Sequence, residues 1–247
     1  MLDNSTAGKL RDMKLPSMAA AFKQQIGNPA FFGMDFEERF GLLVDTEWSS
    51  RNNNRIKRLT RAAGFACPDA CMENVDYRAD RELDKSLLTR LGTCNYIGEH
   101  RNIALLGASG SGKTWLACAF GIAACRKLYT VRYIRMPDML TELAAARVTG
   151  TYRKVIEQYQ KVKLLILDEW LLYPVTDADA QGILEVAERR QLASTIFCSQ
   201  FDAAGWHGKL GGLAIADAIC DRIAHSSYMI LIKGESMRKF NSAPELG

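Results

Sequence analysis

The chain has 247 residues, of which 48% are hydrophobic, and it carries a formal net charge of +4 at pH 7. This length and apolar content suffice for one main domain with a sizeable core plus an appendage, and the small net charge excludes a polycation, so any nucleic-acid surface must be local. No apolar run reaches membrane-spanning length and the polar N-terminus does not fit a signal peptide, so we expect a cytoplasmic protein without membrane contact.

Residues 1–65 are predicted to form a small N-terminal helical domain. Apolar residues recur at helical spacing on both sides of Pro16, which either interrupts or starts a helix, and again from Phe36 to an expected end near Trp48. The segment 51–61 is also helical in pattern and contains five basic residues and no acidic one: Arg51, Arg55, Lys57, Arg58 and Arg61. This basic face is either an ordinary solvated helix surface or a contact with the phosphate backbone of DNA.

Residues 66–100 are predicted to be a connector, with a loop followed by a leucine-rich helix that leads into the first strand. Cys67 and Cys71 could form half of a zinc site, but no second Cys/His pair lies near them in the sequence. The seven cysteines are odd in number and scattered, which indicates reduced thiols.

Residues 101–247 are predicted to form a parallel three-layer α/β domain with a five-stranded sheet. Short apolar runs alternate with segments of helical periodicity, which is the pattern of parallel strands joined by crossover helices. The predicted strands are Asn102–Leu106, Val131–Met136, Leu164–Leu167, Thr195–Cys198 and Tyr228–Ile232, and the predicted helices include Lys113–Lys127, one opened by Pro137, Ala178–Gln191 and Ile215–Ala224.

The sequence GASGSGKT between the first strand and its helix fits the phosphate-loop motif G-x-x-x-x-G-K-[ST]. Backbone N–H groups of such a loop and of the helix N-terminus point at the phosphates of a nucleotide. We expect Lys113 to reach the β- and γ-phosphates and the Thr114 hydroxyl to bind Mg²⁺. The predicted binding residues are Gly107, Ala108, Ser109, Gly110, Ser111, Gly112, Lys113 and Thr114.

Two carboxylates, Asp168 and Glu169, follow the apolar run LLIL at the end of the third strand. Four consecutive apolar residues indicate a strand buried on both faces, as parallel sheets require. We expect Asp168 to hold Mg²⁺ through water and Glu169 to orient and polarise the attacking water. This acidic pair favours hydrolysis by water over phosphate transfer to another substrate, and the chain lacks the N-K-x-D motif of a GTPase.

Three later residues are candidates for sensing the γ-phosphate. The pair Ser199-Gln200 ends the fourth strand, where one residue can contact that phosphate. Arg222 lies on a later helix and is either a plain surface arginine or a finger that reaches into a neighbouring subunit.

The chain resembles the IstB family, the helper ATPases encoded beside the transposase in certain bacterial insertion sequences. The likeness covers nearly the whole chain, and the pair Trp206-His207 followed by A-D-A-I-x-D-R is its most specific part. The other segments that carry it are FEERFGLLVDTEWSSRNNNRIKRLTRAAGF, GASGSGKT, LLILDEW, SQFDAAGWHGKLGG, IADAICDRIAHSS and GESMRK. Outside the family, the chain also resembles the DnaC-type helicase loaders, with which it shares an AAA+ core.

The resemblance implies an AAA+ P-loop NTPase core preceded by a helical domain that mediates self-association into higher oligomers on double-stranded DNA. It implies that ATP governs this assembly, which bends DNA and engages a transposase. It also implies a role for Arg222 as a finger in trans and a weaker nucleotide-sensing role for Arg238. Since only about fifteen residues follow the fifth strand, we expect little or no C-terminal lid.

The expected function is therefore an ATP- and Mg²⁺-dependent DNA-binding ATPase that acts in transposition. The first alternative is a DnaC-like helicase loader in DNA replication, whose main partner is a protein ring rather than duplex DNA. The second alternative is a stand-alone nucleotide-binding protein.

Overall fold

The computed structural model describes residues 2–212, 214–234 and 236–237. The chain divides into two compact units, Met1–Arg58 and Leu59–Gly247. The segment 66–100, expected to be a connector, therefore lies within the second unit. Among the described residues, no helix has both the length and the apolar character that a membrane crossing requires.

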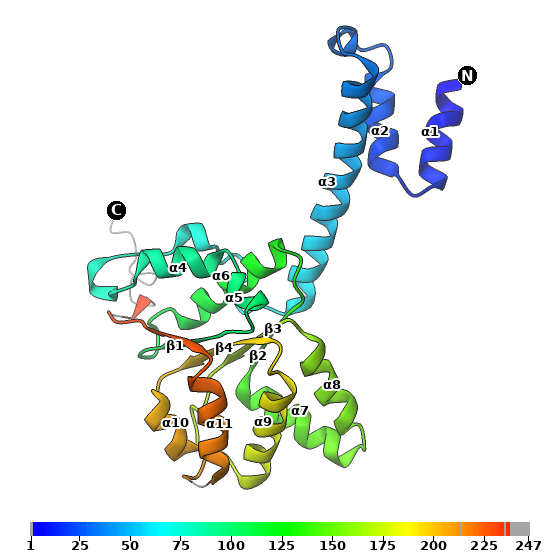
Figure 1. Cartoon of the computed structure of the whole chain (residues 1–247). Helices are drawn as coiled ribbons and strands as arrows, with labels where there is room; N and C mark the ends of the chain where they lie inside the picture. The colour runs from blue at the N-terminus through cyan, green and yellow to red at the C-terminus, as the bar shows by residue number, and fades with distance from the viewer. Residues whose placement is uncertain (1, 213, 235, 238–247) are drawn as a thin grey trace, which may run out of the picture. The chain divides into compact units, whose positions relative to one another are not determined.

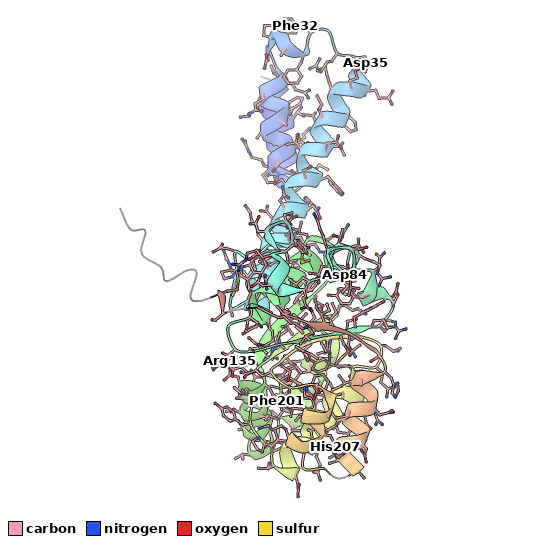
Figure 2. All side chains as sticks on the ribbon, turned by 90° about the vertical axis from the view of Figure 1, so that its left-hand side faces the viewer. Phe32, Asp35, Asp84, Arg135, Phe201 and His207 are labelled. Carbon is pink, nitrogen blue, oxygen red and sulfur yellow. The ribbon has the colours of Figure 1, made fainter. Side chains whose placement is uncertain are left out.

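The first unit consists of α-helices joined by short turns. They are α1 (Leu2–Asp12), α2 (Pro16–Gln25), the 3₁₀ turn η1 (Pro29–Phe31) and the part of α3 (Phe36–Ala63) up to Arg58. Pro16 starts α2, because a proline at the first helical position lacks only an N–H that would be unpaired anyway. Figure 2 marks the turn before α3 with Phe32 and Asp35, and the Asp35 carboxylate caps α3 by accepting from the Glu38 amide at 2.8 Å.

A carboxylate on α3 fastens α2 to it. Glu47 Oε2 accepts the amide hydrogens of Ser17 at 2.9 Å and Met18 at 3.0 Å, which are unpaired donors of the first turn of α2. Burial raises the pKa of Glu47, but the hydrogen bonds from Arg51 and from these two amides outweigh it, so the pKa lies below its ordinary value. Glu47 therefore stays ionised as an acceptor.

The predicted end of the second helix near Trp48 is wrong. The helix α3 continues without a break to Ala63, so the basic segment 51–61 is its last part. No glycine or proline lies between Leu42 and Ala63, and polar residues alone do not terminate a helix.

The second unit is built on a five-stranded sheet with the strand order β2-β3-β4-β1-β5. All neighbouring strands are parallel. The strands are β1 (Asn102–Leu106), β2 (Val131–Arg135), β3 (Leu164–Asp168), β4 (Ser194–Ser199) and β5 (Ser227–Leu231). Because β4 lies between β3 and β1, the segments that follow these three strands meet at one edge of the sheet.

Helices cover both faces of the sheet, which confirms the predicted three-layer α/β class (Figure 1). On one face lie α4 (Lys85–Gly92), α5 (Asn95–Gly98) and α6 (Lys113–Arg126), and on the other lie α7 (Met136–Val148), α8 (Tyr152–Lys161), α9 (Asp177–Arg189), α10 (Ala203–Lys209) and α11 (Ala214–Ala224). Figure 2 shows Asp84, before α4, and His207, in α10, on opposite sides of the sheet. Alternate residues of β1 enter the two cores, Ile103 and Leu105 on the α6 side and Ala104 and Leu106 on the other.

In the second unit, the predicted strands and helices agree with the observed ones to within a few residues, but several observed elements, among them α5, were not predicted. The amphipathic helix α8 and the short helix α10 were not predicted, and the connector contains the 3₁₀ turns η2 (Met72–Asn74) and η3 (Ala79–Arg81) before α4. Leu88 and Leu91 of α4 are buried in the α6-side core, so this segment is packed onto the domain rather than exposed as a linker.

Candidate active site

The phosphate-loop sequence folds as a tight turn between β1 and α6. Its backbone enters conformations that favour glycine, with φ of 152° at Gly107 and 94° at Gly112. A Cβ on Gly107 would lie 2.4 Å from the carbonyl oxygen of Ile232, and one on Gly112 would lie 3.0 Å from Nη2 of Arg81. The loop therefore needs glycine at position 107 for space as well as for backbone angle, and at position 112 for backbone angle.

Lys113 lies at the start of α6 with its side chain turned back over the loop. Its ammonium group donates to the carbonyl oxygens of Gly107 at 2.8 Å and Ala108 at 2.7 Å, and the residue is only 8% exposed. A buried cation held by the loop that precedes its own helix is well placed to meet an anion bound by that loop.

Asp168 at the end of β3 contacts the phosphate loop directly. Its Oδ2 accepts the Thr114 hydroxyl at 2.7 Å and the Tyr133 phenol at 2.7 Å, while its Oδ1 accepts the Glu169 amide at 2.9 Å. Burial, followed by the hydrogen bond to Asp168, raises the pKa of Tyr133, so the phenol remains a donor. The two residues expected to bind Mg²⁺ thus converge, and Tyr133 orients the carboxylate.

Glu169 follows in a left-handed conformation, with φ of 55°. Such a conformation is uncommon outside glycine, costs of order 1–3 kcal/mol, and persists where the surroundings fix it. Here the Trp170 amide donates to the Cys198 carbonyl at 2.8 Å, and the Trp170 ring packs against Phe197 and Trp206. Trp170 thus anchors the turn on which Glu169 is presented.

The end of β4 separates the two candidates for sensing the γ-phosphate. The Ser199 hydroxyl is 1% exposed, donates to the Trp170 carbonyl at 3.0 Å, and accepts the Trp206 indole N–H at 2.8 Å and the Phe201 amide at 3.1 Å. It is therefore fully used in holding the turn together. Gln200, the next residue, lines the cavity beside Glu169, so the geometry favours Gln200 for contact with a phosphate.

Two adjoining cavities share the phosphate loop. One of about 290 Å³ is lined by Ser109, Gly110, Lys113, Thr114, Asp168, Glu169 and Gln200, among others. A second of about 530 Å³ shares Gly110, Lys113 and Thr114 and continues between the loop and the connector, where Asn74, Asp76, Arg81 and Trp115 line it. The first cavity has the dimensions and the donors for a terminal phosphate and a hydrated cation, and the second has room for the rest of a nucleotide.

Arg222 is not part of this cluster. It lies in the last turn of α11, and its carbonyl accepts the hydroxyl of Ser226, which in turn accepts from the Asn102 side chain at the start of β1. The phosphate loop begins at the other end of β1, about 13 Å away for a five-residue strand. The Arg222 guanidinium is half-buried and pairs with Glu188 at 3.0 Å.

The basic residues of α3 all have exposed positions, but they differ in their partners. Arg51 pairs with Glu47 at 2.7 Å and also donates to the Lys14 carbonyl. No ion pair within 4.0 Å is observed for Arg55, Lys57, Arg58 or Arg61 among the described residues. Arg51 is therefore engaged within the first unit, and the other four present free positive charge. Arg238 lies outside the described residues.

The profile of the IstB-like ATP-binding proteins matches residues 8–244. The chain belongs to the IstB-like ATP-binding protein family. A protein of Sinorhizobium fredii named as an insertion sequence ATP-binding protein, y4pL, is 40% identical over 240 residues, covering 97% of this chain and 98% of that protein. ATP is therefore the nucleotide of this IstB-like protein.

Solved structures show the same fold. The DnaC helicase loader superposes with a TM-score of 0.56 at 20% identity, covering 67% of this chain and 97% of that one. DnaA from Aquifex aeolicus with bound AMPPCP superposes with a TM-score of 0.58 at 20% identity, covering 72% of this chain but only 56% of that one. The second unit of the IstB-like protein thus has the same fold as the matched parts of these two proteins.

The most specific sequence feature of the IstB-like chain has a structural explanation. Trp206 of α10 donates to Ser199 at the end of β4, and His207 lies 3.0 Å from Asp217 on α11, so the pair connects α10 to both β4 and α11. Tyr133 and Arg81 were missed from the sequence. Tyr133 lies in a strand that also contains Arg132 and Arg135, so its polar group does not stand out, and nothing in the pattern around Arg81 points to the loop.

Proposed function

We propose that this chain is a Mg²⁺-dependent ATPase that assembles on double-stranded DNA in its ATP-bound state and stimulates a partner transposase. The observation that carries the proposal is the convergence of Lys113, Thr114, Asp168 and Glu169 at one cavity, in a family whose relatives are named for insertion sequences.

The residues present suit ATP with Mg²⁺. The Thr114 hydroxyl and the Asp168 carboxylate are hard oxygen donors at the mouth of the loop, and Mg²⁺ is usually bound by one or two such groups together with substrate phosphates. The described residues contain no cluster of three or more His, Cys, Asp or Glu side chains suited to a metal. When bound, the ion would neutralise charge on the phosphates.

Hydrolysis is assigned to Glu169, with Gln200 opposite it in the same cavity. A carboxylate at this place can accept a proton from water as it attacks, and an amide can donate to the γ-phosphate. The backbone of Glu169 is fixed by its neighbours rather than by its own side chain, so Glu169→Gln is expected to bind ATP and to hydrolyse it slowly. Ser199 and Trp170 hold this turn through the hydrogen bond from the Ser199 hydroxyl to the Trp170 carbonyl.

Arg222 is proposed to act in the site of a neighbouring subunit. Its place at the amino ends of the strands supports this role, because it is too far from its own phosphate loop. Its ion pair with Glu188 must then open when subunits associate. An arginine finger in other NTPases contributes roughly 10³–10⁵ in rate.

The first unit is proposed to mediate self-association and DNA contact. Large apolar side chains are exposed on it, with Phe36 at 81% and Trp48 at 66%, which suits association with another copy. Arg55, Lys57, Arg58 and the neighbouring Arg61 lie on consecutive turns of α3 and offer charge to phosphates without a base-reading arrangement. DNA binding is therefore expected to tolerate sequence changes in the DNA.

The alternative is a helicase loader. The similarity to DnaC concerns the fold at 20% identity, whereas the 40% identical relative that spans this chain is an insertion sequence protein, which favours transposition. The test is strand transfer by the transposase encoded beside this protein, with ATP and with no helicase present. The proposal predicts stimulation that Lys113→Ala abolishes, and it fails if this protein has no effect on strand transfer but loads a replicative helicase.

A further inference from the structure

A cation of the connector lies against the phosphate loop. Arg81 is the last residue of η3, and its own backbone is tied on both sides, since its amide donates to the Arg78 carbonyl at 3.0 Å and its carbonyl accepts the Lys233 amide at 3.3 Å. The connector and the segment after β5 thus hold Arg81 in place from its main chain, independently of what its side chain binds.

The side chain of Arg81 is buried and bonded to the loop. The residue is 6% exposed, and its guanidinium donates to the carbonyl oxygens of Asp76 at 2.9 Å and Ser111 at 2.9 Å. Ser111 belongs to the phosphate loop. The nitrogen that donates to Ser111, Nη2, would lie 3.0 Å from a Cβ on Gly112. Arg81 thus contacts the loop at the residue that precedes α6.

The charge of this guanidinium has no carboxylate partner within 4.0 Å in the described part of the chain. The two acidic side chains that act on this charge are Asp76 and Asp80, of which Asp76 pairs with Arg78 at 2.7 Å and neither forms an ion pair with Arg81 among the described residues. Burial lowers the pKa of Arg81, with partial compensation by Asp76 and Asp80, yet an arginine keeps its charge at neutral pH. A buried charge that meets only neutral carbonyls is costly unless an anion joins it.

The position of Arg81 indicates what that anion is. Arg81 lines the 530 Å³ cavity together with Gly110, Lys113 and Thr114 of the loop. A guanidinium has five N–H donors, and the described protein contacts use only part of them. Arg81 therefore has donors left for an anion held by the loop, in the cavity that it lines together with Lys113.

We propose that Arg81 is a second cationic residue of the nucleotide site, which binds a phosphate oxygen of the nucleotide from the connector of the same chain. This inference rests on the proposed ATP-binding function and extends it to a residue outside the known motif. It also gives the connector a means of responding to the nucleotide, because the same side chain bonds Asp76 in the connector and Ser111 in the loop.

The test compares ATP with tripolyphosphate, which carries the phosphates but no base or ribose. Loss of a hydrogen bond to a charged group predicts that Arg81→Gln binds both about 10- to 100-fold more weakly. Arg81→Lys, which keeps the charge, should recover part of that loss. The control is Arg126→Gln, since Arg126 lies at the far end of α6 and pairs with Glu73 on the surface, so both affinities should be unchanged.

The results that would overturn this proposal differ from the result that would overturn the proposed function. Unchanged tripolyphosphate affinity in Arg81→Gln refutes the proposal. If the affinity for ATP alone falls, Arg81 contacts the base or the ribose instead. If Arg81→Gln does not fold, the NMR signal of the ¹⁵N-labelled Arg81 guanidinium is followed in the wild-type chain, with Arg81→Lys used to assign it. The proposal predicts that this signal shifts when tripolyphosphate is added, and no shift refutes the proposal. In this experiment, the proposed function is refuted by a different result, namely that wild-type protein does not bind ATP.

Discussion

Replacing Tyr133 by phenylalanine tests how the site orients its Mg²⁺ carboxylate. The phenol donates to Asp168 Oδ2 at 2.7 Å, and the substitution removes this bond while leaving the ring, which packs against the buried cluster that contains Cys118 and Ile122. A hydrogen bond to a charged group contributes about 1.5–3 kcal/mol. Asp168 keeps the Thr114 hydroxyl and the Glu169 amide as donors, so the lower end of this range applies.

Losing about 1.4 kcal/mol of binding free energy lowers an affinity tenfold. A tenfold loss of metal affinity is usual when a residue that orients a metal ligand is replaced. We therefore expect Tyr133→Phe to need about tenfold more Mg²⁺ for half-maximal ATP binding, with ATP affinity at saturating Mg²⁺ close to that of wild type. The assay is a Mg²⁺ titration of the binding of a fluorescent ATP analogue, followed by the same titration of hydrolysis.

The matched control is Tyr159→Phe. Tyr159 is buried and donates to the carboxylate of Glu142 at the same 2.7 Å, but it belongs to the core on the other face of the sheet. Tyr159→Phe should lower the stability of the protein and leave the Mg²⁺ titration unchanged. Equal Mg²⁺ requirements for wild type and Tyr133→Phe would refute the assigned role of Tyr133.

Three further predictions test the phosphate loop, the first unit and the contacts that hold the turn after β3. Gly107→Ala should abolish ATP binding because its Cβ would overlap the Ile232 carbonyl. The control Gly150→Ala, also at positive φ but in open space, should cost only roughly 1–2 kcal/mol of stability and keep ATP binding. Equal ATP affinities of the two variants would contradict this prediction. Glu47→Gln should speed hydrogen exchange of the Ser17 and Met18 amides. The pKa of Glu47 is lower in the folded protein than in the unfolded chain. In wild type, the protection of these amides should therefore be complete above the unfolded pKa and be lost as the pH falls through the folded pKa. Equal protection in wild type and Glu47→Gln at neutral pH would contradict this account. Trp206→Phe should cost about 1–3 kcal/mol in urea unfolding because Ser199 loses a buried donor, and an unchanged midpoint would argue against the assigned contact.

Much of the second unit could be predicted from the sequence. Buried parallel strands are continuous apolar runs, so β1 was predicted with its observed bounds and the others to within one or two residues. The phosphate loop and Asp168-Glu169 follow from short motifs, because residues close in sequence form them. The strand order then brings the two motifs together.

Contacts between distant segments could not be predicted. Ser199 was a reasonable candidate for a phosphate contact until its hydroxyl proved to bond Trp170 and Trp206, which lie on other elements. The same applies to Arg81, whose contact with Ser111 joins residues thirty positions apart. The length of α3 was missed for a different reason, since its polar middle has no apolar periodicity although nothing in it breaks a helix.

The central claim is that ATP in this site controls association with DNA, and sedimentation on duplex DNA of mixed sequence tests it most directly. With ATP and Mg²⁺, wild-type protein should form large assemblies on the DNA, and Glu169→Gln should form assemblies that persist because hydrolysis is slow. Lys113→Ala, which removes the cation held over the loop, should form none, and ADP should not substitute for ATP. Assembly on DNA that is equal with ATP, with ADP and in Lys113→Ala would contradict the account.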